Sequence, residues 1–367
     1  MRLTTAGESH GPRMTAILEN VPAGLPVDVL SAEELLRLRR GGEERSERQK
    51  TEKDEIRFTG GIRAGVTTGS PVCIEIENGD FRPAFAEGRE ERKITALRPG
   101  HADLPGMIKY GFSSAEDVAE RASARSTVAV VAAGAVAREF LSRLGVVVGG
   151  YVDCLGSVRD GEARSFGEIL KSKEKPLYML ADGGTDEIRK AKREGETLGG
   201  TVKIVVRGMK CGFGGYGSFG RRIDGKIAGA LVGLPCVKGI EFGDGFSLCS
   251  RMGTETVDGI RYDAANGGYY RETNRAGGIE GGMTNGEDIV VRLAVKPVPT
   301  TARGVKTVDC VTKEETVSAK IRSDISAVPA LLVVAECALS LLLTEEISLR
   351  LGGDTMAEIE ERWKKLP

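Results

Sequence analysis

Apolar residues recur at helical spacing in several parts of the chain, and these patterns predict the main helices. In 31–40, Ser31 and Glu34 form a capping-box pattern ahead of a leucine-rich segment, so we predict a short helix there. A longer helix is predicted at 126–144, which is apolar on most faces and therefore typical of a buried helix. Two more helices are predicted at 222–232 and 327–346.

The most apolar run of the chain covers residues 328–343. It contains Pro329 and Glu336 and is too short and too polar to span a bilayer, so we expect a buried core helix. Further along, Asp354 is placed to cap a short C-terminal helix that carries Trp363.

Alternation of apolar and polar residues predicts strands at 72–77, 201–207 and 289–296. Each strand follows a Thr-x-Gly sequence, and a β-branched residue (Val72, Val202 or Ile289) comes three positions after the glycine. This spacing indicates a weak internal pseudo-repeat of a turn-plus-strand unit, with coincidence as the alternative. Helices and strands alternate too irregularly for a doubly wound sheet, so we predict an α+β fold.

The composition is that of a globular protein with an unusual amount of glycine. The chain has 367 residues, of which 40% are hydrophobic and 29% are charged. Its 50 glycines follow no collagen-like period and therefore mark turns and close backbone approaches. A net charge of −1 and an aromatic content of 5% argue against a nucleic-acid binder. No low-complexity or proline-rich linker divides the chain, so we treat 1–367 as a single domain.

Seven cysteines are scattered along the chain, at positions 73, 154, 211, 236, 249, 310 and 337. Their number is odd and no two form a Cys-x-x-Cys pair, so neither a disulfide framework nor a zinc site is indicated. Together with the lack of a signal-peptide pattern, this usage favours the reducing cytoplasm.

The chain contains only two histidines, His10 and His101, and both lie in polar, glycine-bearing motifs. Histidine exchanges a proton near neutral pH, and the placement of both in loop-like sequence indicates chemistry rather than structure. The motif from Gly7 to Gly11 also matches the Gly-x-Ser-x-Gly elbow of serine hydrolases. Only six residues precede it, so the central strand and sheet of that fold are missing, and we disfavour a hydrolase.

Several other segments are suited to an anionic ligand. Arginines and a serine precede the alanine-rich helix in 120–125, and a helix start attracts anions. Glycines cluster in 277–283, and Lys296 is followed by two prolines in 297–300. Asp324, just ahead of the long C-terminal helix, is either a helix cap or a site residue. These features predict an enzyme that transfers protons on a small, highly anionic substrate, without identifying the reaction.

Taken in order, these motifs resemble the chorismate synthase family over nearly the whole chain. The first half carries GESHG at 7–11, PAGL at 22–25, TTGSP at 67–71, RPGHAD at 98–103, KYG at 109–111 and ERASAR at 120–125. The second half carries VKGIEFGDGF at 237–246, NRAGGIEGGMTNGE at 274–287, RSD at 322–324 and AVP at 327–329. Any one motif is weak evidence, whereas the full set in the family's order is specific.

The resemblance implies a lyase for the last common step of the shikimate pathway, in aromatic amino acid biosynthesis. Its substrate would be 5-enolpyruvylshikimate 3-phosphate, which loses phosphate and the C6 proton in an anti-1,4-elimination to give chorismate. Reduced FMN (FMNH2) is required without net redox change, and this cofactor supplies the unusual chemistry.

The resemblance also implies a fold and a set of partners. The fold is a β-α-β sandwich with helices between antiparallel sheets and internal pseudo-symmetry, assembled as a cytoplasmic homotetramer. We expect an external flavin reductase, with NADPH only as an indirect reductant, because no reductase domain is visible in the sequence. No nucleic acid or membrane is expected as a partner.

Three catalytic roles carry over from the resemblance. His10 is expected as the general acid near the departing phosphate, His101 as the group that protonates or hydrogen-bonds the flavin, and Asp324 as an aid to proton removal. Flavin or nucleotide contacts are expected from Arg39, Arg45, Arg121, Ala122, Ser123, Gly281, Lys296, Pro297, Val298, Pro299, Thr300 and Arg322. The rest of the charged stretch 39–55 is expected to be a solvated loop, and no metal is expected.

The sequence departs from the family pattern at a few positions, and none of them is a catalytic candidate. They are Gly41 and Gly42 in place of Pro-Gly, 234–236 in place of a flavin-contacting pair, Ser126 in place of a glutamate, and 114–117, which lacks an arginine. Two other functions stay open. A non-catalytic flavin-binding or nucleotide-binding descendant is expected to have lost a catalytic residue, and a metal-dependent phosphatase needs clustered carboxylates.

Overall fold

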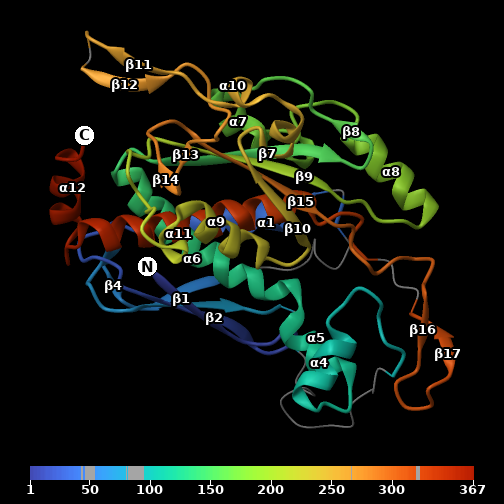
Figure 1. The fold of residues 1–367 in the computed structure, drawn as a ribbon. Coiled ribbons are helices and arrows are strands. Elements are labelled where there is room, and N and C mark those ends of the chain that lie inside the picture. Colours follow the sequence, from blue (N-terminus) through green and yellow to red (C-terminus); the bar gives the residue numbers. More distant parts are fainter. Residues whose placement is uncertain (43, 46–53, 80, 82–94, 266, 320–322) are drawn as a thin grey trace.

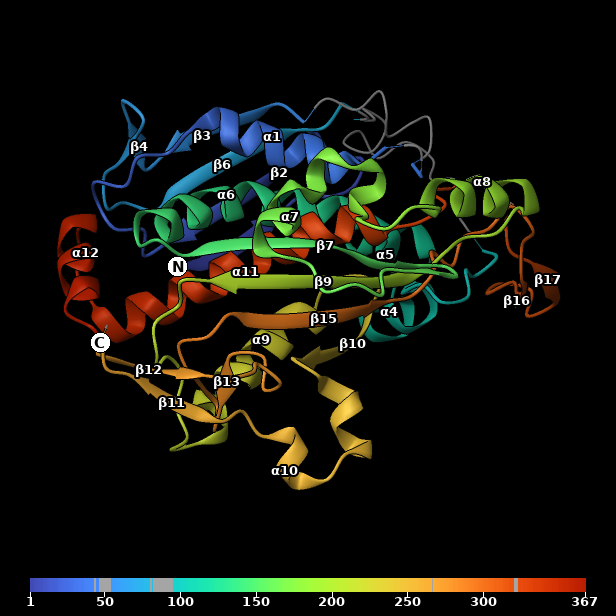
Figure 2. The same ribbon diagram turned by 90° about the horizontal axis from the view of Figure 1, so that it is seen from above.

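Two antiparallel sheets enclose a layer of helices (Figure 1). The computed structural model that shows this arrangement describes residues 1–367 except 43, 46–53, 80, 82–94, 266 and 320–322. The enclosed helices are α1 (Val29–Arg40), α6 (Thr127–Arg143) and α11 (Val328–Leu351). The view from above shows the larger sheet lying across α11 (Figure 2). The predicted α+β sandwich is therefore confirmed.

The first sheet has four strands in the order β1-β2-β6-β3. They are β1 (Arg2–Ala6), β2 (Arg13–Glu19), β6 (Val72–Glu77) and β3 (Ile56–Gly60). Along β6, buried and partly exposed side chains alternate strictly, which is the pattern of a sheet with one face on a core. The buried face packs against α6. The strand predicted at 72–77 is confirmed.

The second sheet has five strands in the order β10-β15-β9-β7-β8. They are β10 (Val237–Phe242), β15 (Ile289–Val295), β9 (Gly200–Arg207), β7 (Val147–Leu155) and β8 (Val158–Arg159). Strand β7 is buried along nearly its whole length because it contacts both α11 and α7 (Phe166–Leu170). The strands predicted at 201–207 and 289–296 are confirmed as β9 and β15, which pair with each other.

The Thr-x-Gly sequences that precede three strands do not share one backbone conformation. Gly69 and Gly286 both adopt positive φ, of 83° and 97°, which favours glycine. Gly199 does not, and its side-chain position is instead filled by the backbone of β15, with the Val295 carbonyl oxygen 2.5 Å from an ideal Cβ. The turn is therefore shared by two of the three sites.

Helices α6 and α11 cross at very close range. An ideal Cβ on Gly134 of α6 would lie only 2.3 Å from the Cβ of Cys337 on α11, so glycine permits this contact. Helix α11 has the length and apolar character of a membrane span, yet 83% of its most apolar stretch is buried inside the protein. The prediction of a buried core helix is confirmed.

The helix ends correct the sequence predictions in detail. Helix α1 begins at Val29, ahead of the predicted start, because Asp28 accepts hydrogen bonds from the backbone N–H groups of residues 30 and 31. Helix α12 (Met356–Lys364) is capped by Thr355, one residue after the predicted Asp354, through a capping box with Glu358. Helix α11 continues to Leu351, beyond the predicted end at 346. The helices predicted at 126–144 and 222–232 are confirmed as α6 and α9 (Ile223–Val232).

Shorter elements surround this framework. The helices are α4 (Asp103–Tyr110), α5 (Ala115–Ala122), α8 (Gly184–Glu194) and α10 (Gly253–Thr256), with 3-10 turns η1 (Ala124–Ser126), η2 (Lys171–Glu174), η3 (Pro176–Tyr178), η4 (Phe219–Arg221) and η5 (Gly245–Ser250). The paired strands are β4 (Ile62–Arg63) with β5 (Val66–Thr67), β11 (Ile260–Asp263) with β12 (Gly268–Arg271), β13 (Ile279–Glu280) with β14 (Met283–Thr284), and β16 (Lys306–Val308) with β17 (Glu315–Val317). Helices α4 and α5 lie next to each other and well away from α12 in both views (Figures 1 and 2).

Candidate functional site

The GESHG motif forms the turn between β1 and β2, so His10 lies at the edge of the first sheet. Gly7 has a φ of 115°, and a Cβ there would lie 2.6 Å from a backbone carbonyl oxygen, so the turn requires glycine. Asn78, just past β6, donates through its amide to the carbonyl oxygens of Ser9 and Gly11 at 2.6 and 2.9 Å. The motif is thus a hairpin turn rather than the strand-to-helix elbow of a hydrolase.

Glu120, in the last turn of α5, contacts both the ring and the backbone of His10. One carboxylate oxygen lies 2.6 Å from Nδ1 of the ring, and the other accepts the backbone N–H of His10 at 2.8 Å. The backbone carbonyl of Glu120 also accepts the N–H of Ser9 at 3.0 Å. The Glu120 side chain is 7% exposed and that of His10 is 19% exposed. A short charge-assisted contact with little solvent access fixes the ring firmly.

The ERASAR segment lies where α5 gives way to α6. The hydroxyl of Ser123 is 3.2 Å from that of Ser9, so this segment touches the GESHG turn. The exposed Arg121 donates to the carbonyl and hydroxyl oxygens of Thr5 at 3.2 and 3.0 Å. Arg125 instead turns inward and pairs with the buried Asp54 at 2.5 Å. Of these two arginines, Arg121 is the one placed to meet an anion from solvent.

The RPGHAD motif forms a tight turn against the segment that follows β15. Gly100 has a φ of 76°, and a Cβ there would lie 2.9 Å from the Cβ of Pro299. Lys296 donates through Nζ to the Gly100 carbonyl at 2.8 Å. The Thr300 hydroxyl lies 3.1 Å from Nε2 of His101. The predicted turn is confirmed, and three predicted flavin contacts are brought beside His101.

A bidentate pair fixes the base of this turn. Arg98 donates to both carboxylate oxygens of Asp103, at 2.8 and 2.7 Å, and Asp103 is 1% exposed at the start of α4. Burial by itself raises the pKa of Asp103, but the hydrogen bonds and charge of Arg98 outweigh it and lower the pKa. The turn and the helix start are therefore held together at neutral pH.

The surroundings of His101 favour its neutral form. Burial and the neighbouring cations Arg98 and Lys296 lower its pKa below the ordinary value. Its Nδ1 lies 3.2 Å from the carbonyl oxygen of Pro99, which can only accept, so this nitrogen carries a proton. In the neutral ring Nε2 is then an acceptor for the Thr300 hydroxyl. His101 is thus poised to exchange hydrogen bonds through Nε2.

Asp324 pairs with Arg45 at 2.8 Å, and their side chains are 18% and 7% exposed. The N-cap of α11 is Ala327, so the interpretation of Asp324 as the helix cap is wrong. The backbone N–H of Ile325 donates to the carbonyl of Glu44 at 2.7 Å, which ties the same two segments a second time. Two residues predicted from separate motifs are therefore direct partners.

A chain of contacts joins the three catalytic candidates. The Ser323 hydroxyl, next to Asp324, donates at 2.6 Å to the carbonyl of Thr300, whose hydroxyl touches His101. Beyond His101, helix α4 packs on α5, where a Cβ on Gly106 would lie 2.4 Å from Val118. Helix α5 in turn holds His10 through Glu120. The arrangement links two imidazoles and one carboxylate, the kinds of group that transfer protons.

The Arg39 guanidinium is buried and makes hydrogen bonds within the protein instead of facing solvent. Arg39 is 3% exposed and donates to the Thr127 hydroxyl and the Ala124 carbonyl, both at 2.9 Å, which anchors the end of α1 to the start of α6. The expectation of a solvated loop for the rest of 39–55 is wrong for Glu44 and Asp54, which are buried, whereas Gly42 and Glu55 are exposed. Residues 43 and 46–53 lie outside the described part.

Of the other predicted flavin contacts, some lie near the segments that hold the histidines and one does not. Ala122 is exposed at the end of α5, and Pro297 and Val298 lie beside Lys296, with the Val298 carbonyl accepting the Thr197 hydroxyl at 2.6 Å. Gly281 lies in the β13–β14 turn, which is well apart from α4 and α5 in both ribbon views. Within one chain, Gly281 is therefore not brought to the histidines. Arg322 lies outside the described residues.

Sequence reasoning missed two supports of the site. Glu120 was grouped with an anion site, whereas it is the partner of His10; its only sequence signal is its place in the ERASAR motif. The β16–β17 hairpin was not predicted, because its strands are short and mixed in polarity. It supports the RPGHAD turn, since the Thr307 hydroxyl donates to the Leu97 carbonyl at 2.7 Å and the Cys310 N–H donates to Thr95 at 2.8 Å.

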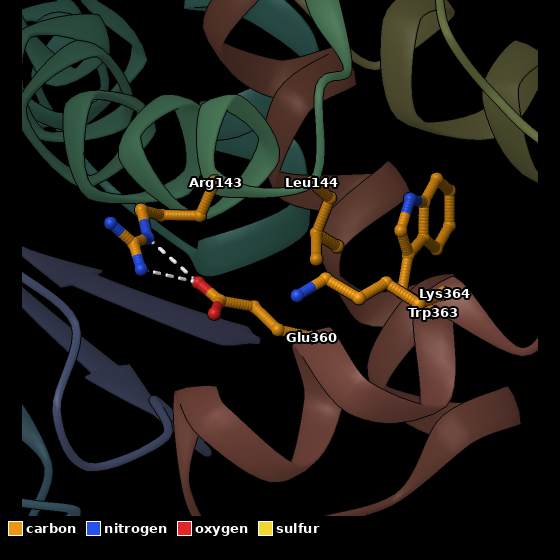
Figure 3. Close-up of a pocket in the computed structure, with 5 residues that line it drawn as sticks. All are labelled: Arg143, Leu144, Glu360, Trp363 and Lys364. Atoms are coloured by element: carbon orange, nitrogen blue, oxygen red, sulfur yellow. Dashed lines mark hydrogen bonds and ion pairs between the residues drawn. The ribbon is translucent and has the colours of Figure 1, made fainter.

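A cavity of about 300 Å³ lies elsewhere, between the last turn of α6 and α12 (Figure 3). It is lined by Arg143, Leu144, Glu360, Trp363 and Lys364, and Arg143 donates to Glu360 at 2.7 Å. His10 and Glu120 lie near the other end of α6, some 25 Å along a helix of this length, so the cavity is separate from the histidine loops.

The fold and these loops define a class of protein: an α+β sandwich enzyme that exchanges protons with an anionic small molecule. Comparison with known proteins specifies the family. The chain matches the family model described as chorismate synthase over residues 1–347. It is 44% identical over 374 residues to a chorismate synthase of Thermus thermophilus, covering 99% of this chain and 97% of that protein. It is 42% identical over 375 residues to one of Carboxydothermus hydrogenoformans, with coverage of 99% and 97%.

A solved structure gives the same result. "Crystal Structure of Chorismate Synthase" superposes with a TM-score of 0.80 at 34% identity, covering 99% of this chain and 96% of that chain. The chain therefore belongs to the chorismate synthase family, and the resemblance seen in its motifs is confirmed.

Proposed function

We propose that this chain acts as a single domain, residues 1–367, that converts 5-enolpyruvylshikimate 3-phosphate into chorismate and phosphate by anti-1,4-elimination. The bond to the phosphate oxygen breaks and the C6 proton is lost, so there is no net redox change, and the product feeds aromatic amino acid biosynthesis. The observation that carries the proposal is the contact chain that links His10, His101 and Asp324, on a chain whose family match spans residues 1–347.

His10 serves as the general acid for the departing phosphate. Its ring is held by Glu120 at 2.6 Å, and the exposed Arg121 lies one residue further along α5. An imidazole next to a carboxylate is readily supplied with a proton, and a guanidinium nearby attracts a phosphate. The two together neutralise the charge that develops on the leaving group.

His101 and Asp324 serve other steps than the loss of phosphate. Because His101 is favoured in its neutral form, it works by hydrogen bonding through Nε2 at neutral pH and becomes a proton donor only when an anion is bound beside it. Asp324 assists removal of the C6 proton, with Arg45 fixing the orientation of its carboxylate.

Reduced FMN is the proposed cofactor, and the donor groups present suit it. Lys296 and Arg121 are cations with accessible surface, and Thr300 and Ser123 add hydroxyl groups, so together they fit an anionic, planar molecule. Ala122, Pro297, Val298, Pro299, Gly281, Arg45 and Arg322 complete the proposed contacts. Arg39 fits less well and contributes by fixing the start of α6. When bound, reduced FMN supplies electron density that helps to expel phosphate.

We further infer a cytoplasmic homotetramer served by an external flavin reductase, with NADPH acting only through that reductase. The reducing compartment is supported by seven cysteines that are all free. Assembly is supported by large exposed apolar side chains on the β11–β12 hairpin.

The first test is an anaerobic assay of the purified protein. It is mixed with 5-enolpyruvylshikimate 3-phosphate and dithionite-reduced FMN, and chorismate and phosphate are measured together. We expect both products in equal amounts, and neither with oxidised FMN. Phosphate alone would indicate a phosphatase, and neither product with flavin still bound would indicate a binding protein.

Replacing either histidine tests the assigned roles. His10→Ala and His101→Ala should each lower turnover by roughly 100-fold or more, as expected for loss of an acid–base group. Both residues lie in loops and contribute little to the core, so circular dichroism should show the native fold. A variant with unchanged turnover removes that histidine from the mechanism.

A further inference from the structure

We propose that Glu120 is the positioning residue for His10, and that it makes Nε2 the nitrogen that exchanges a proton with the departing phosphate. The inference rests on the proposed function for the identity of the reaction, and on the contacts of Glu120 for the geometry. Glu120 touches His10 rather than the reacting atoms, so it acts through the histidine.

Glu120 makes three contacts with the GESHG turn, and each contact restrains a different motion. The 2.6 Å contact to Nδ1 fixes the plane of the ring, and the 2.8 Å contact to the His10 N–H fixes its backbone. The third, from the Ser9 N–H to the Glu120 carbonyl at 3.0 Å, ties the turn to α5. A carboxylate that binds both the ring and the backbone of one residue leaves that ring little rotational freedom.

The contact to Nδ1 also determines where the proton is held. An ionised carboxylate only accepts, so Nδ1 carries a proton in both states of the ring. The proton that is gained and lost therefore belongs to Nε2. In the transfer, the Nε2–H bond breaks and an O–H bond forms on the phosphate oxygen; the ring then returns to its neutral form with Nδ1 protonated, and water restores the Nε2 proton.

The partners of the two histidine rings differ in charge. Among the described residues, the carboxylates nearest to His10 in the GESHG turn and in the last turn of α5 are Glu8 and Glu120. The guanidinium of Arg121 is directed to Thr5. Arg125 on η1 is neutralised by Asp54. The ring of His101 has the opposite surroundings, with a backbone carbonyl on Nδ1 and cations nearby. The difference separates the two histidines into a proton donor and a hydrogen-bond partner.

The direct test is nuclear magnetic resonance on the protein without flavin, with histidine labelled by ¹⁵N. Two imidazoles are present, and His101→Gln identifies the signals of His10. In the wild-type protein, neutral His10 should show its proton on Nδ1. A neutral ring protonated on Nε2 overturns the proposal without any variant of Glu120 being needed.

Glu120→Gln then removes the charge while keeping the size of the side chain. We expect the neutral His10 ring to lose its preference for the Nδ1 proton, because an amide can donate as well as accept. Turnover should fall roughly 10-fold to 100-fold with little change in KM. Glu120→Asp should keep the carboxylate and so keep the proton on Nδ1.

The matched control is Glu75→Gln, which removes an equivalent carboxylate that pairs with Arg13 at 2.6 Å on the same sheet. It should leave the tautomer of neutral His10 and the turnover unchanged. A Glu120→Gln enzyme that is slower but still has the neutral His10 proton on Nδ1 shows a purely structural role and overturns the proposal. If the wild-type enzyme makes no chorismate, the proposed function fails, while the resonance data still decide the role of Glu120.

Discussion

At the scale of single residues, two histidines from similar glycine-bearing motifs are given different chemistry by their partners. The ring of His10 contacts the carboxylate of Glu120, which is 110 residues away in sequence. The ring of His101 contacts the hydroxyl of Thr300, which is 199 residues away. The motifs alone predicted that both residues carry chemistry. They could not predict which partner each ring meets, because those contacts depend on how α5 and the segment after β15 pack.

The lowered pKa of His101 predicts how stability depends on pH. The unfolded chain has an ordinary histidine pKa of about 6.5, so between that value and the lower folded pKa the unfolded state binds more protons. Stability is therefore full above about pH 6.5 and decreases as the pH falls through the folded pKa. His101→Asn keeps the polar contacts and removes the titration, so it should lose less stability on acidification.

The measurement is the free energy of unfolding in urea at about pH 7.5 and pH 5.5, on both proteins without flavin. The two proteins differ only at residue 101, so the contributions of all other groups cancel in the comparison. If both proteins lose the same free energy between the two pH values, the assigned cause is wrong.

At the scale of elements, the central helices and three main strands were predictable, whereas their ends and the small hairpins were not. Apolar periodicity marked α6, α9 and α11 because each has a broad buried surface. The start of α1 was misplaced because Asp28 outcompetes Ser31 as the cap, and a capping pattern does not show which oxygen the backbone meets. The β16–β17 hairpin has no apolar face to mark it.

The close crossing of α6 and α11 predicts a large effect from one methyl group. In Gly134→Ala the new Cβ would lie 2.3 Å from the Cβ of Cys337, so the helices must separate. We expect the free energy of unfolding to fall by about 1–3 kcal/mol, despite the better helix propensity of alanine. Urea titration measures this loss. Cys337→Gly in the same chain should recover part of it, and additive losses would show that the two sites do not clash.

The β16–β17 hairpin should affect catalysis although it carries no candidate catalytic residue. Thr307→Val keeps the shape of the side chain and removes the 2.7 Å hydrogen bond to the Leu97 carbonyl, next to the RPGHAD turn. We expect a loss of about 1 kcal/mol in stability and a several-fold loss of turnover, with faster amide exchange in 95–97. Thr316→Val changes the residue paired with Thr307 across the hairpin and serves as the control. Equal turnover in both variants would contradict a supporting role.

At the scale of the whole molecule, the residues that form the core and the candidate catalytic residues lie in different parts of the sandwich. The core lies between the two sheets, while His10, His101 and Asp324 lie in segments between elements and are held by partners from elsewhere in the chain. Loops held by a rigid framework can carry strained turns and buried charges that a core could not tolerate. The β13–β14 turn that contains Gly281 lies apart from α4 and α5 within one chain, so the flavin contact proposed for Gly281 would require another copy of the chain.

The β11–β12 hairpin projects from the body of the molecule and is where assembly can be tested (Figure 1). Tyr262 and Tyr269 pair across it with ring centroids 5.1 Å apart, yet they are 58% and 76% exposed. Aromatic rings left this open are expected to be covered by another copy of the chain. Tyr269→Glu places a charge among them and should convert the proposed tetramer into smaller species in sedimentation velocity, whereas Tyr269→Phe should leave the assembly unchanged. A Tyr269→Glu protein that remains tetrameric would place the interface on another surface.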